Sequence, residues 1–162
     1  ASVYVTQVNR LKSDVTTNVN IVKTTIMIDL TGLKDGGTAG DIIGKDGAGV
    51  AFIGQVTTAN QGTVFGVTMT CVETPTGGDT DINLVTAATE QAYSGSTSLT
   101  VVLDAGAAVI GAEDAAALDD NSLDAQYLYL AYGGSRDGGT AAEYTAGKFL
   151  IRLYGHVAPD DV

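Results

Sequence analysis

The sequence is poor in the side chains from which most active sites are built. Its 162 residues include one cysteine, one histidine and no tryptophan. A single thiol excludes a disulfide framework within one chain and a zinc site made of several thiolates. The lone histidine, His156, leaves little material for imidazole-based catalysis. We therefore expect a protein that is not an enzyme and that holds no cofactor.

Positive charge is also scarce. The chain has 8 lysines and arginines against 19 aspartates and glutamates, which gives a formal net charge of −11. Binding to nucleic acid needs clustered Lys and Arg to neutralise phosphates, so this balance argues against a nucleic-acid partner. No apolar run approaches the ~18–20 residues that a membrane span requires, and we expect no membrane contact. The first residues lack the basic start and apolar core of a signal peptide, so we expect synthesis in a cytoplasm.

The pattern that the sequence does contain is that of β-strands. In residues 148–157, Phe149, Ile151 and Leu153 occupy alternate positions, as expected for a strand with one buried face. Residues 126–132 are apolar on both faces, which suits a central strand or one that a partner covers. Further segments rich in β-branched residues cover residues 19–30, 50–56, 63–74, 81–86 and 97–103.

Turn residues separate these segments. Most of the 21 glycines lie between predicted strands, where the positive φ that glycine adopts easily is useful. Helix is predicted only as short pieces, in residues 86–93 and 111–118, with a single turn at 41–43. The sequence therefore predicts an all-β fold, with one jelly-roll-like β-sandwich domain in residues 19–162 and long Gly-rich loops.

Residues 1–18 differ from the rest, because short apolar pieces are spaced among polar residues. Two structures fit this pattern. The segment is either the first strand of the sandwich or an extended N-terminal arm that pairs with the sheet edge of a neighbouring subunit. The apolar residues of this segment are the candidate interface residues: Val3, Tyr4, Val5, Val8, Leu11 and Val15.

Carboxylates cluster at three places: Asp79 with Asp81, residues 119–124, and Glu113 with Asp114. Oxygen-rich loops of this kind can bind calcium. Neither of the first two clusters has the glycine and the terminal glutamate of an EF-hand loop. We interpret these clusters as solvated acidic loops, and we predict no metal site.

Two other features are better explained by structure than by catalysis. Cys71 shares a predicted strand face with Phe65, Val67 and Met69, which indicates a buried core residue and not a nucleophile. The loop at residues 44–49 is superficially similar to a phosphate-binding loop. Its lysine is followed by an aspartate where that motif needs Ser or Thr, and we interpret it as a turn between strands.

Several turn-and-strand segments resemble those of a known family. They are residues 30–34 (LTGLK), 37–44 (GTAGDIIG), 69–73 (MTCVE), 78–82 (GDTDI) and 144–155 (YTAGKFLIRLYG). These segments are similar to parts of the small structural proteins of marine tailed bacteriophages, which are virion components. Together they span most of the chain.

The resemblance implies a virion structural protein, and within the family we favour a capsid decoration (cement) protein. Such a protein would be assembled in the host cytoplasm and would bind the major capsid protein on the outer capsid surface, as a homo-oligomer with a trimer favoured. The acidic charge suits a surface that faces salty water. Two alternatives stay open. One is another virion part, such as a tail-tube, head-completion or fibre protein, and the other is a calcium- or glycan-binding β-sandwich module.

Overall fold

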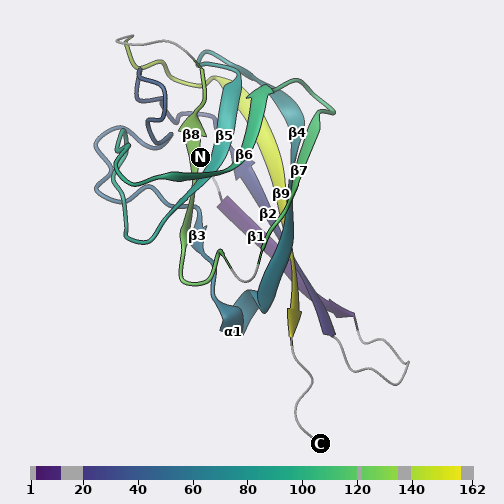
Figure 1. The fold of residues 1–162 in the computed structure, drawn as a ribbon. Coiled ribbons are helices and arrows are strands. Elements are labelled where there is room, and N and C mark those ends of the chain that lie inside the picture. Colours follow the sequence, from purple (N-terminus) through teal and green to yellow (C-terminus); the bar gives the residue numbers. More distant parts are fainter. Residues whose placement is uncertain (1–2, 12–19, 120–121, 135–139, 158–162) are drawn as a thin grey trace, which may run out of the picture.

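The computed structural model describes residues 3–11, 20–119, 122–134 and 140–157. Their strands form two antiparallel sheets (Figure 1). The first sheet has five strands in the order β1 (Val3–Leu11), β2 (Asn20–Asp29), β9 (Ala146–Val157), β4 (Thr63–Thr76) and β7 (Glu113–Ala117). The second has four strands in the order β3 (Gly54–Gln55), β8 (Tyr127–Tyr132), β5 (Asp81–Ala87) and β6 (Thr100–Ala107).

The strand order is that of a jelly roll. Without β1, the two sheets read β2-β9-β4-β7 and β3-β8-β5-β6, so each has four strands. From β2 onward every connection crosses from one sheet to the other, except the β5–β6 hairpin. Eight antiparallel strands in two such sheets define the jelly-roll architecture. The predicted all-β, jelly-roll-like sandwich is confirmed.

The main core lies between the two sheets and follows the predicted alternation. Phe149, Ile151 and Leu153 of β9 are buried, while the residues between them are partly exposed. Burial of apolar surface stabilises a fold by roughly 25 cal/mol per Å², so this interface is the main source of stability. The same hydrophobic cluster includes Val67, Met69, Cys71, Ile82, Leu84, Leu128 and Leu130.

One residue of β4 departs from its predicted face. The ladder between β4 and β9 shifts register between Val64 and Gly66, and Phe65 at this irregularity is 42% exposed. An irregularity of this kind changes the side of the sheet toward which a side chain points. Phe65 therefore lies on the outer face, where its ring centroid is 6.2 Å from that of His156, and not in the core with Val67.

The outer face of the four-stranded sheet is also covered. Tyr129 and Ala131 of β8 form a second buried cluster with Val85, Ala87 and Ile42. Ile42 belongs to the long segment between β2 and β3, and it forms a β-bridge with Ala131. This contact explains the apolar residues on both faces of β8. The chain itself, through this segment, provides the cover.

The predicted helices are wrong. Residues 111–118 contain strand β7, which pairs with β4. Frequent alanine favours helix only weakly, and pairing with a neighbouring strand overrides that preference. Residues 86–93 begin in β5 and contain no helix, and residues 41–43 form the β-bridge to β8 instead of a helical turn.

Two further differences lie on either side of β3. Residues 50–56 were predicted as a strand, but only Gly54–Gln55 pairs with β8. The amides of Ala51 and Ile53 donate to different partners, Gln91 and Leu128, so no regular ladder forms there. Helix α1 (Thr58–Gln61) was not predicted, and its N-terminus is capped by the Thr57 hydroxyl.

For the N-terminal segment, the structure supports one of the two predicted alternatives. Residues 3–11 form β1, which pairs with β2 of the same chain at the edge of the five-stranded sheet. Within this chain, residues 3–11 thus form the edge strand of the sheet. The candidate interface residues Val3, Tyr4, Val5, Val8 and Leu11 lie in this strand. Val15 lies outside the described residues.

Helix α1 lies so close to β9 that only glycine fits at one contact. A Cβ atom at Gly155 would lie 1.9 Å from the carbonyl oxygen of Gln61. We predict that Gly155→Ala destabilises the fold by about 1–3 kcal/mol, because the helix would have to move. Gly66→Ala on β4 is the control, since its Cβ would approach no atom closer than 3.8 Å. Chemical denaturation measures both, and equal stability of the two variants would contradict the prediction.

Candidate interaction surface

No metal-binding group of side chains is found among the described residues. Within them, no three His, Cys, Asp or Glu side chains come together in a way that could hold a metal ion. No helix in the same residues is long and apolar enough to cross a membrane. Cys71 is buried as predicted, and this burial raises the pKa of its thiol, which disfavours the nucleophilic thiolate.

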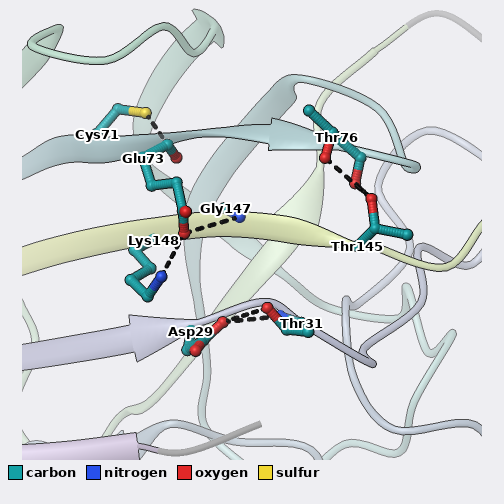
Figure 2. Close-up of polar contacts among 8 residues, drawn as sticks. All are labelled: Asp29, Thr31, Cys71, Glu73, Thr76, Thr145, Gly147 and Lys148. Atoms are coloured by element: carbon teal, nitrogen blue, oxygen red, sulfur yellow. Dashed lines mark hydrogen bonds and ion pairs between the residues drawn. The ribbon is translucent and has the colours of Figure 1, made fainter.

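Polar contacts on β4 and β9 have a structural explanation. Figure 2 shows Glu73 of β4 paired with Lys148 of β9 and accepting a hydrogen bond from the Gly147 amide, while the Cys71 thiol donates to the Glu73 carbonyl oxygen. The hydrogen bond from Lys148 lowers the pKa of Glu73 and raises that of the lysine. Both side chains are about 40% exposed. Such pairs contribute little stability, so they align the strands and form no site.

A second polar contact joins β7 to the same sheet. The Arg152 guanidinium on β9 donates to the Thr70 hydroxyl at 3.0 Å and to the Glu113 carboxylate at 3.1 Å. Thr70 in turn donates to Glu113 at 2.5 Å. Glu113 is exposed, as predicted, but it lies in strand β7 and not in a loop, and its carboxylate links this outermost strand to the centre of the sheet.

Two buried carboxylates organise the segment between β2 and β3. Asp35 is 1% exposed and accepts hydrogen bonds from the amides of Ala142 and Asp79, at 2.9 and 3.3 Å. Asp41 is also buried and accepts from the Thr38 amide and the Ser94 hydroxyl. Neither residue is predicted from the sequence as a structural acid. A signal was present, because both stand among glycines in a long loop whose amides need acceptors.

The cluster at Asp79 and Asp81 is more buried than predicted. Asp79 accepts a hydrogen bond from the Asp81 amide. The Oδ1 atoms of Asp81 and Asn83 are buried with no hydrogen-bond partner, and both lie against Gly133, where a Cβ would be 2.2 and 2.9 Å from them. Burial, followed by the carboxylates of Asp104 and Asp79, raises the pKa of Asp81. Asp81 is therefore a partly buried acid whose ionised form is disfavoured, and not a freely solvated one.

In the predicted cluster at residues 119–124, one acid has a structural role, and Asp120 lies outside the described residues. The Asp124 carboxylate accepts hydrogen bonds from the amide and the hydroxyl of Thr58, at 2.9 and 2.6 Å. These bonds lower the pKa of Asp124 and fix the start of α1. Asp119 is exposed, as predicted.

An apolar pocket opens beside the segment between β2 and β3. The cavity has a volume of about 160 Å³. Its wall includes Ile28 of β2, Leu130 of β8, and Ile43. Two further lining residues, Val50 and Phe52, are 46% and 36% exposed. A cavity of similar size lined by apolar residues can hold a benzene ring, so this pocket can take one bulky side chain.

A second exposed apolar feature is the turn between β6 and β7, residues 108–112, here called the apolar turn. Val109 and Ile110 are 57% and 69% exposed. The backbone beneath them is fixed, because the Ile110 amide donates to the Thr74 hydroxyl at 2.9 Å and the Gly111 amide to the Cys71 carbonyl oxygen at 2.8 Å. Gly111 has a φ of +88°, which favours glycine. Turns usually carry polar side chains, so a rigid turn with two large apolar ones is unusual.

The third feature is the open edge of β1. This strand has nine residues and pairs with β2 on one side, and no other described strand pairs with its outer side. The ladder to β2 skips Thr6, where the register shifts between Val5 and Gln7. An edge strand of this length presents unpaired backbone groups to a further strand.

Comparison with known proteins identifies no relative of this chain. No family model matches the chain, and searches of curated proteins and of solved structures found no match.

The raised pKa of Asp81 makes the stability of the fold depend on pH in a testable way. Because the pKa of folded Asp81 is raised, its ionised form opposes folding at neutral pH, and this penalty disappears as the pH falls below the unfolded-state pKa of about 3.9. We predict that Asp81→Asn raises the melting temperature at pH 7 and that the difference shrinks toward pH 3.5. Glu90→Gln, at an exposed acid, is the control. A lower melting temperature for Asp81→Asn at pH 7 would contradict this account.

Proposed function

We propose that this chain is a capsid decoration protein of a tailed bacteriophage. It is assembled in the host cytoplasm as a homotrimer, binds the major capsid protein on the outer capsid surface and cements the shell. It carries out no catalysis and needs no cofactor. Sequence resemblance suggested this role, and three features of the structure support it.

The observation that carries the proposal is a complete jelly roll with an added edge strand, β1. Jelly rolls occur in viral capsid domains, but also in lectins and cupins, and a fold alone does not fix a function. The added edge strand β1 is therefore the feature that supports a role in assembly. Its open edge can add a strand of a neighbouring protein, so that backbone hydrogen bonds give affinity and the alternate side chains give specificity.

Rigid loops are the second supporting feature. Asp35 and Asp41 hold the segment between β2 and β3 through buried hydrogen bonds. A rigid surface loses little conformational entropy on binding, which favours a permanent contact with a shell.

Charge is the third supporting feature. Lys34, Lys148 and Arg152 are already paired with carboxylates on the chain itself. With a formal net charge of −11, the surface is left strongly acidic. Such a surface repels packaged nucleic acid and keeps particles apart in solution, so it suits the outside of a capsid.

The number of copies per particle tests the role. We expect purified virions to contain this protein at a copy number similar to that of the major capsid protein, because a cement protein covers the whole lattice. Quantitative mass spectrometry of intact particles measures the ratio. A few copies per particle would instead point to a tail, fibre or head-completion protein.

The β1 edge can be tested without damaging the domain. Proline removes the amide hydrogen of Thr6, which the ladder to β2 skips, and proline is tolerated at strand irregularities. We predict that Thr6→Pro weakens binding to shells of the major capsid protein by about tenfold or more, as measured by co-sedimentation. Thr6→Ala keeps the amide and should bind like the wild type. Equal binding of both variants, with unchanged melting temperatures, would exclude β1 as the contact.

A further inference from the structure

One chain carries both an apolar pocket and an exposed apolar turn. The pocket is an open cavity of about 160 Å³ with Val50 and Phe52 exposed in its wall. The apolar turn presents Val109 and Ile110 on a rigid backbone. A cavity without occupant atoms loses the contacts that close packing provides, and exposed apolar groups are stabilised by burial.

The two features cannot meet within one molecule. In Figure 1 the segment between β2 and β3, which forms much of the pocket wall, lies at the left, and the turn between β6 and β7 lies at the upper right. A contact between them must therefore join two copies. Because it uses a different surface on each copy, it is a heterologous contact, and repetition of it closes a ring if the rotation allows.

Charge complementarity favours a second copy as the occupant. Two charged side chains line the pocket. Asp29 accepts hydrogen bonds from the amide and the hydroxyl of Thr31, whereas Lys45 is exposed and forms no ion pair within the described residues. The apolar turn leads directly into Glu113 and Asp114, and Asp114 has no cationic partner in the same residues. Glu113 is already paired with Arg152, so the attraction across the contact would be between Lys45 beside the pocket and Asp114 beside the turn. The formal net charge of −11 on each copy opposes association, and a cation–carboxylate contact reduces this repulsion locally.

We propose that the apolar pocket of one copy receives the Val109–Ile110 turn of the next copy, and that this contact builds the ring-shaped homo-oligomer. The inference deepens the proposed function by naming the surface that joins the subunits, and in this respect it rests on that function. Its test uses the purified protein alone. Failure of shell binding and failure of self-association are thus separate results.

The experiment breaks each half of the contact and then combines the halves. Ile110→Asp removes the inserted side chain, and Val50→Asp places a carboxylate in the pocket wall near the acids of the incoming turn. Each variant should dissociate into monomers, with self-association weakened roughly tenfold or more. Val101→Asp is the matched control, because Val101 is 54% exposed on β6 and belongs to neither surface. It should assemble like the wild type. Sedimentation velocity measures the states, and circular dichroism checks the fold.

Mixing the two defective variants is the decisive step. Ile110→Asp keeps an intact pocket and Val50→Asp keeps an intact turn, so an equimolar mixture should form heterodimers with one good contact but no closed ring. A mixture that stays monomeric would overturn the proposal, because a turn-to-pocket contact requires this complementation. A monomeric wild type would also overturn the proposal. So would Ile110→Asp and Val50→Asp variants that still form the ring, or a Val101→Asp control that dissociates in the same way as these two variants.

Discussion

The burial of β8 on both faces is the constraint on which the rest of the structure depends. Its inner side chains, Leu128 and Leu130, complete the core between the sheets, while Tyr129 and Ala131 need a second cover. The segment between β2 and β3 supplies that cover. Two buried carboxylates hold this segment. Asp41 accepts a hydrogen bond from the Thr38 amide of the same segment, and Asp35 accepts from the amides of Ala142 and Asp79 in neighbouring loops. The apolar pocket forms at the margin of this cover, beside Leu130.

The fold class could be predicted because alternation is a local signal. In β9, Phe149, Ile151 and Leu153 mark the buried face in the sequence alone, and the structure confirms them. The course of β7 could not be predicted in this way. Its alanines have no strong preference for a strand, and only the partner residues on β4 determine their conformation. Phe65 was placed on the wrong face because a shift in register depends on pairing and leaves no trace in residue periodicity.

The candidate surfaces were harder to predict than the fold. The edge strand β1 was among the alternatives, since its apolar residues are visible in the sequence. The pocket could not be predicted, because its wall combines residues from β2, β8 and the segment before β3, which are far apart in the sequence. Ile110 is a candidate interface residue only because its side chain is exposed, and the sequence alone does not distinguish it from a core residue. The environment of each acid was equally hard to predict from the sequence. Asp35 is buried, Asp81 has a raised pKa and Glu113 forms an ion pair, although the sequence alone does not distinguish these acids from one another.

Cys71 gives the protein a built-in probe of its own motions. It is the only cysteine, it is 3% exposed, and it lies on β4 in the core between the sheets. A thiol reagent can reach it only when the sandwich opens, so the rate of modification reports the opening equilibrium without any engineered label. Contact with a shell or with other copies would slow that rate, and thiol labelling would thus follow assembly from inside the domain.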